Sequence, residues 1–364
     1  MLNTLVAFSN RYGIDPELVL AGGGNTSAKD DEVMFIKGSG TTLGTITADG
    51  FVKMDRKKLS LMMAKEYPET DAEREALALS DMMEAKFQGQ ESKRPSVETL
   101  LHALFPTKYV LHLHPAKVNG LTCSVNGKEE TLKMFPEAVF VEICKPGYIL
   151  AKLCKERMDE YKKANGKESR LIFLQNHGVF FAADTVEELE KMLQSVIDKI
   201  DEKIAEYPDF SDSGVSSDAD LCKKMAKLYS DEAVCLHDTS KISIEFSKDE
   251  ESVKPLIKPF TPDHIVYCKA NPLYAEDENN LETLFAEYKE KYSYAPKIIV
   301  VKGKGFFSVS DNEKQALTAQ LLFKDAMKIA VYSKAFGGPL SMTDEMTDFI
   351  VNWEVEAYRA KQAQ

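Results

Sequence analysis

The sequence predicts an α/β protein of two domains, and three observations lead to this prediction. Short apolar segments with strand character alternate with segments of helical periodicity along the chain. The chain has 364 residues, 44% of them hydrophobic, so it can bury one large core or two modest ones. The stretch PDFSDSGVSSDAD has the Ser, Asp and Gly content of a linker. We therefore expect a first domain over residues 1–208, a linker over 209–220 and a second α/β domain over 221–364.

The start of the first domain combines a helix, a hairpin and two loops of small residues. Residues 1–20 have helical character, which the glycine run at 22–24 ends. The segments NTSAK (25–29) and VMFIK (33–37) then form a hairpin around an Asp-Asp turn. A second loop, GSGT, follows at residues 38–41.

The rest of the first domain continues the alternation of helices and strands. We first expect helices over 70–88 and 96–105, and Ser96 would cap the second of them. Strands over 109–115 and 139–143 follow, and then a helix that ends near Lys163. A hairpin over 171–183 leads to a last helix, which begins with the capping box of Thr185 and Glu188.

The second domain contains a segment that resembles part of the first. Residues 295–323 repeat the plan of residues 169–197: an apolar strand, a turn with glycine, an aromatic strand, an Asp and a capped helix. Lys304 stands there in place of His177, which is a candidate metal ligand of the first domain, so this copy would lack that ligand. We expect a degenerate repeat; the alternative is a coincidence, because many strand-turn-strand-helix units share this plan.

The pair His112 and His114 is the strongest chemical signal in the sequence. The two residues stand two apart in a strand, and the strand period of two directs both imidazoles to one face. Leu111 and Leu113 then point to the opposite face and into the core. This geometry suits one metal ion.

A third ligand and a carboxylate are available elsewhere in the first domain. His177 lies in a hairpin turn beside Gly178, although a turn histidine can also simply face water. Glu98 lies in the first turn of the helix before the strand of His112, where a tight return would place its carboxylate beside the imidazoles. His102, one helical turn after Glu98, is more typical of a buried helix residue.

The two loops of small residues favour a phosphate site. GGGNTS and GSGTT offer backbone N–H groups and hydroxyls, and Ser96 adds another hydroxyl at a helix start. The metalloprotease motif HExxH and the phosphate-binding motif GxxxxGK[ST] are both absent from the sequence. The sequence therefore gives little support to a metalloprotease or a nucleotide hydrolase.

Five motifs in this order resemble the class II aldolase/adducin family over about residues 1–207. The motifs are GGGNTSAK, KGSGTTLG, PSVETLLHALFP, YVLHLHP and QNHGVFFAA. The whole chain, including TPDHIVY and the final helix MTDFIVNWEVEAYRAK, is most similar to the aldolase portion of bifunctional rhamnulose-1-phosphate aldolase/dehydrogenases. The resemblance implies a three-layer fold around a central, mainly antiparallel sheet.

The resemblance also implies roles for individual residues. His112, His114 and His177 would hold zinc or another divalent metal. Glu98 would bind the metal at rest and move a proton during catalysis. The phosphate would be bound by residues of the two loops and by the serine before Glu98: Asn25, Ser39, Gly40 and Ser96. Val97 stands where some relatives have a second serine, and Lys37 or Lys29 could compensate.

The implied activity is that of a metal-dependent carbon–carbon lyase of carbohydrate metabolism. It would cleave a ketose 1-phosphate, such as rhamnulose 1-phosphate, to dihydroxyacetone phosphate and an aldehyde. A pentulose-phosphate 4-epimerase, a sugar-phosphate dehydratase and a non-catalytic adducin-like binding module remain alternatives on the same scaffold. Family aldolases often complete the site with a tyrosine of a neighbouring subunit, so we expect a homo-oligomer.

Composition excludes several other partners. The formal net charge of −12 would repel nucleic acid. Six cysteines without a CxxC pair are typical of reduced thiols in the cytoplasm. No leader and no apolar stretch of about 18 residues is visible, so we expect no membrane association. The expected partner is a small sugar phosphate.

Overall fold

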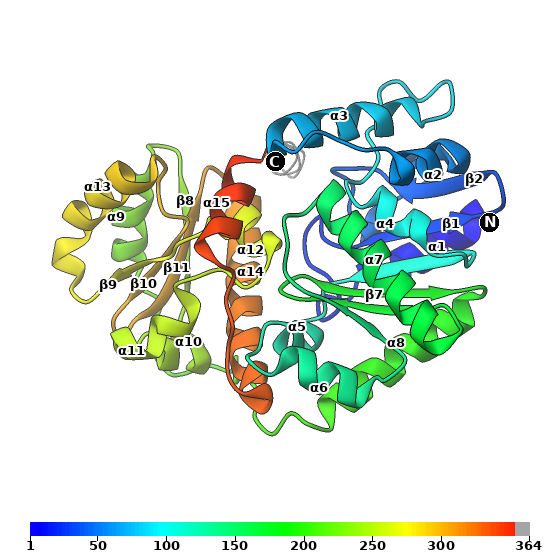
Figure 1. Cartoon of the computed structure of the whole chain (residues 1–364). Helices are drawn as coiled ribbons and strands as arrows, with labels where there is room; N and C mark the ends of the chain where they lie inside the picture. Colours follow the sequence, from blue (N-terminus) through cyan, green and yellow to red (C-terminus); the bar gives the residue numbers. More distant parts are fainter. Residues whose placement is uncertain (354–364) are drawn as a thin grey trace. The chain divides into compact units, whose positions relative to one another are not determined.

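The computed structural model describes residues 1–353, and the chain divides into two compact units. The first unit comprises Met1–Thr122 and Asn126–Lys203, and the second comprises Cys123–Val125 and the residues from Ile204 onward. The first is coloured from blue to green in Figure 1, and most of the second from green to red. The predicted division into domains over 1–208 and 221–364, with a linker at 209–220, stays a prediction.

A seven-stranded sheet forms the centre of the first unit. Its strand order is β3-β2-β1-β4-β7-β6-β5, and each neighbouring pair is antiparallel except β5 and β6. The mainly antiparallel sheet predicted from the sequence is therefore confirmed. The strands are β1 (Asn25–Lys29), β2 (Val33–Lys37), β3 (Phe51–Asp55), β4 (Tyr109–Leu113), β5 (Val139–Val141), β6 (Leu171–Leu174) and β7 (Gly178–Ala183).

Helices cover this sheet in two layers, so the three-layer α/β fold is confirmed (Figure 1). Helices α2, α3, α4 and α7 share one apolar core with the sheet, while α1 contacts β1 and α8 contacts β4 and β7. The helices are α1 (Leu2–Gly13), α2 (Arg56–Ala64), α3 (Asp71–Glu84), α4 (Thr99–Leu104), α5 (Ala116–Thr122), α6 (Gly127–Met134), α7 (Tyr148–Asn165) and α8 (Val186–Asp201), with short 3-10 turns η1 (Leu43–Thr45) and η2 (Ala48–Gly50).

The first helix is shorter than predicted, because it ends at Gly13 and not near residue 20. Gly13 packs directly on the backbone of the following 3-10 turn: a Cβ atom there would lie 2.1 Å from the nitrogen of Gly44. Pro16 follows three residues later and has no N–H to continue the helix. Close packing and a proline thus end a segment whose apolar pattern alone would continue.

Helix α8 shows how sequence pattern becomes packing. Its buried residues repeat at intervals of three and four, so one face of the helix lies on the sheet. Thr185 Oγ1 accepts a hydrogen bond from the N–H of Glu188, as the predicted capping box requires. The carboxylate of Glu188 accepts from the N–H of Asp184, one residue earlier than the ideal box. The buried residues are Leu189, Leu193, Val196 and Ile200.

The second unit has a four-stranded sheet in the order β8-β11-β10-β9. Its strands are β8 (Val234–Asp238), β9 (Leu273–Ala275), β10 (Ile298–Val301) and β11 (Gly305–Ser310). Its helices are α9 (Ala219–Tyr229), α10 (Lys241–Phe246), α11 (Glu250–Val253), α12 (Pro262–Cys268), α13 (Leu281–Tyr292), α14 (Glu313–Tyr332) and α15 (Asp344–Asn352), with 3-10 turns η3 (Lys254–Leu256), η4 (Glu278–Asn280) and η5 (Ser333–Phe336). The final helix predicted over 346–361 corresponds in part to α15, which ends at Asn352, and residues 354–361 of the prediction lie outside the described residues.

The four strands of the second unit repeat the plan of β4-β7-β6-β5. In both sets the first two neighbouring pairs are antiparallel and the last is parallel. His112 pairs with Phe180 across β4 and β7 and stacks on its ring at 3.9 Å, and His237 does the same with Phe307 at 3.8 Å. Lys304 lies in the turn that corresponds to the turn of His177. These correspondences support the degenerate repeat.

Among the helices of residues 1–353, none combines the length and the apolar content that crossing a membrane requires.

Candidate metal centre

Three histidines converge at one end of the first unit's sheet. His112 is the penultimate residue of β4, His114 directly follows that strand, and His177 lies in the turn between β6 and β7. Their metal-binding nitrogens all lie within 4.8 Å of one another. The Nε2 atoms of His112 and His114 are 2.9 Å apart. The structure therefore brings together the three histidines that the sequence suggested as metal ligands.

The surroundings of His112 fix which ring nitrogen faces this cluster. Its Nδ1 donates to the carbonyl oxygen of Val179 at 3.0 Å, and its ring stacks on Phe180. Nε2 is therefore the nitrogen that faces the other two histidines and that a metal ion could bind. The side chain is completely buried, so its position is held by packing.

Gly178 allows the turn of His177 to approach the strand of the other two ligands. A Cβ atom on this residue would lie 2.4 Å from the carbonyl oxygen of Leu113 and 2.7 Å from Cδ2 of His114. Asn176, on the other side of His177, has φ of 57°, a conformation that Asn adopts more readily than most residues. The turn thus places His177 beside the other two histidines, and a residue larger than glycine at position 178 would push the turn away from them.

Glu98 contributes the carboxylate of the cluster. Its Oε1 lies 3.2 Å from Nε2 of His112 and 3.3 Å from Nε2 of His177. The prediction that Ser96 caps the following helix is wrong: α4 begins at Thr99 and its N-cap is Glu98. Ser96 instead forms the preceding turn, where its hydroxyl accepts from the N–H of Glu98 at 3.2 Å and its carbonyl from Thr99. This turn directs the carboxylate to the histidines.

The charge state of Glu98 follows from two opposing effects. Burial would raise the pKa of this carboxyl group, but the imidazoles of His112, His177 and His114 outweigh burial and hold the pKa well below its ordinary value. Glu98 is therefore a carboxylate in the folded protein.

This donor set fits a divalent metal ion. Three imidazole nitrogens and one carboxylate oxygen are the ligand types that zinc prefers. Two of the nitrogens, on His112 and His114, approach to 2.9 Å, and a bound cation would satisfy lone pairs that face each other at this distance. A histidine that binds a metal usually donates a hydrogen bond from its other ring nitrogen, and Nδ1 of His112 donates in this way to the carbonyl oxygen of Val179.

Asn25 has a contact that sequence reasoning missed. Its side-chain amide donates to Oε2 of Glu98, whereas Oε1 is the oxygen that lies next to His112 and His177. Strand β1 pairs with β4, and Asn25 lies opposite His112 in that pairing. From the sequence, Asn25 was expected only to bind phosphate. Its contact with Glu98 could have been predicted only from the pairing of β1 with β4.

The other phosphate candidates lie on two neighbouring segments. The N–H of Ser39 donates to the carbonyl of Arg94 at 2.8 Å, and the N–H of Ser96 donates to the carbonyl of Lys37 at 3.1 Å. Gly40 follows with φ of 84°, a left-handed conformation that glycine adopts without strain. Ser39 and Ser96 are thus brought side by side, although the N–H group of Ser39 is already used.

Two lysines lie near these segments. The ammonium group of Lys37 is buried and donates to the carbonyl of Gly22 at 3.1 Å, so it links the second loop to the glycine run. The ammonium group of Lys29 donates to the carbonyl of His102 at 2.7 Å. Burial lowers the pKa of Lys29 to about 7.

His102 belongs to the core and not to the group of three histidines. It is completely buried in α4, and its Nδ1 is 2.8 Å from the hydroxyl of Ser27. Burial lowers its pKa well below the ordinary value, so the ring is neutral. The interpretation of His102 as a buried helix residue agrees with this placement.

The fold and the site together define a three-layer α/β domain with a group of histidines able to hold a metal ion. The family model of the class II aldolase and adducin N-terminal domain matches residues 3–198. The chain belongs to this family.

Two relatives illustrate the range of similar proteins. A Bacillus subtilis (strain 168) protein, described as the uncharacterized oxidoreductase YuxG, is 24% identical over 408 residues, which cover 98% of this chain and 57% of the relative. The chain thus spans little more than half of that relative's length. The structure of the N-terminal class II aldolase domain of a conserved Thermoplasma acidophilum protein has a TM-score of 0.46 and 28% identity, over 54% of this chain and 91% of the other.

The L-fuculose-1-phosphate aldolase of Thermus thermophilus is a further structural neighbour. It has a TM-score of 0.36 and 16% identity, over 55% of this chain and 94% of the other.

Proposed function

We propose that this chain is a divalent-metal-dependent aldolase that cleaves a ketose 1-phosphate, such as rhamnulose 1-phosphate, to dihydroxyacetone phosphate and an aldehyde. The observation that carries the proposal is the convergence of three imidazole nitrogens with the carboxylate of Glu98. Membership of the class II aldolase and adducin family supports the reaction class.

In this proposal His112, His114 and His177 hold zinc or another divalent ion. The bound ion would act as a Lewis acid that polarises the substrate's carbonyl group and stabilises the negative charge left by bond cleavage. The protein's own part is to keep the three rings in place. Stacking on Phe180 and the hydrogen bond to Val179 do so for His112.

Glu98 is the proposed acid/base residue. As the bond between C3 and C4 breaks, its electron pair stays with the dihydroxyacetone phosphate half, and the hydroxyl on C4 gives its proton to the carboxylate of Glu98 to become the aldehyde. The protonated Glu98 then delivers this proton to C3. The low pKa keeps Glu98 ionised before the reaction, and the amide of Asn25 holds its other carboxylate oxygen, Oε2.

The phosphate group would lie against the paired segments of Ser39, Gly40 and Ser96. The hydroxyls of both serines are available to donate, and the turn at Ser96 leads directly to Glu98. The amide of Asn25 already donates to Glu98, so Asn25 would contact the phosphate only through its second amide hydrogen. Lys37 is a nearby buried lysine, and its ammonium form would supply positive charge in a chain whose net charge is −12.

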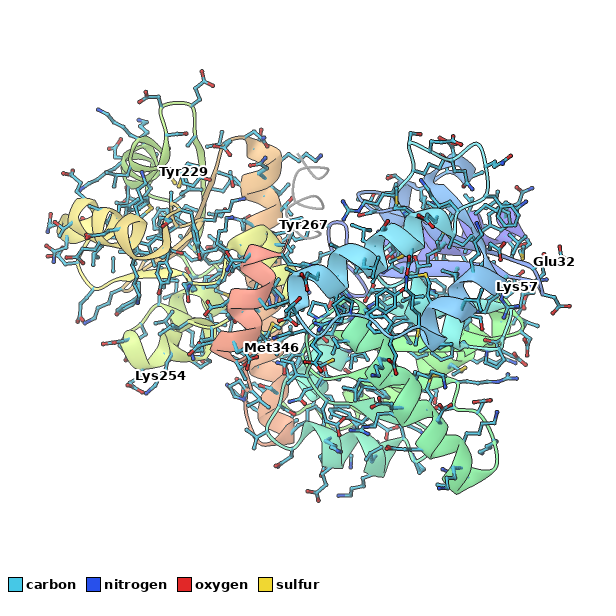
Figure 2. All side chains as sticks on the ribbon, turned by 45° about the horizontal axis from the view of Figure 1, so that its top comes forward. Glu32, Lys57, Tyr229, Lys254, Tyr267 and Met346 are labelled. Atoms are coloured by element: carbon cyan, nitrogen blue, oxygen red, sulfur yellow. The ribbon has the colours of Figure 1, made fainter. Side chains whose placement is uncertain are left out.

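A coupled assay for triose phosphate tests the reaction. Purified protein with added zinc is offered rhamnulose, fuculose and ribulose phosphates, and we expect release of dihydroxyacetone phosphate from a ketose 1-phosphate. Glu98→Gln should reduce the rate by about 100-fold or more. Glu32→Gln is the matched control, because Glu32 is exposed in the turn between β1 and β2 (Figure 2).

Two outcomes would contradict the proposal. Consumption of a substrate without triose phosphate would indicate an epimerase or dehydratase. Full activity of Glu98→Gln would remove the acid/base role from Glu98.

A further inference from the structure

A cavity of about 690 Å³ lies in the first unit, apart from the histidine cluster. Leu171, at the start of β6, lines it, whereas His177 follows the end of the same strand. Three residue steps separate Leu171 from Leu174, which corresponds to roughly 10 Å along a strand. The volume is within the range of roughly 300–1,000 Å³ that is typical of small-molecule sites.

The inner wall of this cavity is apolar and rigid. Phe135, Leu171 and Val196 line it and are each almost completely buried. Phe135 also stacks on Phe173 with 5.1 Å between ring centroids, so the floor is fixed by the core. The partly buried side chain of Met192, from α8, adds a flexible apolar surface.

The rim of the cavity carries three positively charged side chains, of which only one forms ion pairs with carboxylates within residues 1–353. Arg170 forms an ion pair with Asp184 at 3.1 Å and approaches Glu188 at 3.7 Å. Lys167 and Lys191 are exposed, and neither has an ion-pair partner within residues 1–353. The rim therefore offers two available ammonium groups in a chain with a net charge of −12.

The carboxylates of the rim offset these cations only in part. Glu168 is already paired with Lys162 at 2.6 Å. Glu137 is the other acidic residue of the lining, so one further carboxylate stands against the two lysines that have no ion-pair partner within residues 1–353. The site combines an apolar floor with a net positive rim.

We propose that this cavity binds an organic anion that has an apolar ring or chain and one negatively charged group. The apolar part would lie on Phe135, Leu171 and Val196, and the charged group would lie between Lys167 and Lys191. An inorganic phosphate lacks the apolar part, and a neutral hydrocarbon lacks the charge. This site is independent of the proposed aldolase reaction.

Fluorescence of 1-anilinonaphthalene-8-sulfonate tests the site, because this probe has aromatic rings and one sulfonate. We expect saturable binding of one probe molecule per chain at this site. Ser195→Trp should abolish it, because Ser195 is exposed on α8 and lines the cavity, so the indole would fill the space. Circular dichroism and metal content confirm that this variant is folded.

Charge variants test the rim. Lys167→Glu and Lys191→Glu should each weaken probe binding by about three- to tenfold. Lys57→Glu is the matched control and should change it by less than about twofold, because Lys57 lies on α2 at the outer surface (Figure 2). The neutral analogue N-phenyl-1-naphthylamine should bind at least about tenfold more weakly than the sulfonate.

Three results would overturn the inference. Unchanged probe affinity in Ser195→Trp would show that the probe binds elsewhere. Displacement of the probe by inorganic phosphate would place it in the phosphate site of the metal centre. Equal affinity for the neutral analogue would remove the requirement for an anion.

Discussion

At the scale of single residues, Asn25 and Glu98 form the contact that most affects the proposed chemistry. The amide of Asn25 holds one carboxylate oxygen of Glu98, while the other oxygen faces His112 and His177. A carboxylate held in this way can present only one oxygen to the substrate. We therefore propose that Asn25 is a positioning residue for Glu98.

Asn25→Ala separates this role from phosphate binding. If Asn25 positions Glu98, kcat should fall by about tenfold or more while KM changes little. If Asn25 mainly binds phosphate, KM should rise instead. Steady-state kinetics with a responsive ketose 1-phosphate distinguish the two, and zinc content should match the unmodified protein in both cases. An unchanged kcat would contradict the positioning role.

Lys29 gives a prediction about stability and pH. Burial lowers its pKa from 10.5 to about 7, so the folded protein loses this proton well before the unfolded chain does. Between about pH 7 and pH 10 the unfolded state binds more protons, and the free energy of unfolding gains a contribution that rises with pH. This contribution should be absent from Lys29→Met.

Urea unfolding at pH 7 and pH 9.5 measures this difference. The unmodified protein should gain at least about 1 kcal/mol relative to Lys29→Met over this interval. Lys57→Met, on the exposed surface, is the control and should behave like the unmodified protein. If the free energy of unfolding changed equally with pH in the unmodified protein and in Lys29→Met, the lowered pKa of a buried Lys29 would be contradicted.

At the scale of elements, the close approach of β7 to β4 determines whether the three histidines meet. Gly178→Ala should disrupt this approach, because the added methyl group would overlap the Leu113 carbonyl and the ring of His114. We expect a loss of about 1–3 kcal/mol of stability and a weaker affinity for zinc. Calorimetry and zinc titration measure the two effects.

Gly305→Ala is the matched control in the second unit. A Cβ atom at Gly305 would lie 2.2 Å from the carbonyl oxygen of Asp238, an overlap like that at Gly178. It should therefore destabilise the protein without changing zinc affinity. A loss of zinc affinity in Gly305→Ala, or none in Gly178→Ala, would contradict the local role of Gly178.

Local patterns in the sequence predicted much of these elements. The period of two in β4 placed His112 and His114 on one face, and an Asn-His-Gly turn placed His177 between two strands. The contact of Asn25 with Glu98 could not be predicted in this way. It depends on the pairing of β1 with β4, which joins residues far apart in sequence and is decided by the packing of the whole sheet.

The beginning of α4 was also beyond sequence reasoning. Ser96 had the residue type of a helix cap, but it forms a turn of its own and the helix begins at Thr99. Residues with short polar side chains stabilise both structures, so residue type alone does not choose between them. In this chain the turn places Glu98 beside the histidines.

At the scale of the whole molecule, the two units share a strand plan but differ at the position of the third histidine. Lys304 pairs there with Asp218 at 3.0 Å and with Glu278. A positive side chain thus takes the place of the proposed metal ligand and links the turn to η4 and to Asp218, the N-cap of α9. The second unit would be a structural copy without the metal centre.

Lys304→Met tests this structural role. It should lower the stability of the protein by about 1 kcal/mol, because two partly exposed ion pairs are lost. Zinc content and the rate of aldol cleavage should not change. Loss of zinc in this variant would contradict the assignment of the metal centre to the first unit alone.

The metal content of the purified protein tests the central claim most directly. After loading with zinc and dialysis, mass spectrometry should find about one ion per chain, and His112→Ala should lose it. His237→Ala is the control, because His237 stacks on Phe307 as His112 stacks on Phe180. It should keep the ion. A protein that retains no divalent ion after loading, or a His112→Ala variant that keeps both ion and activity, would contradict the account.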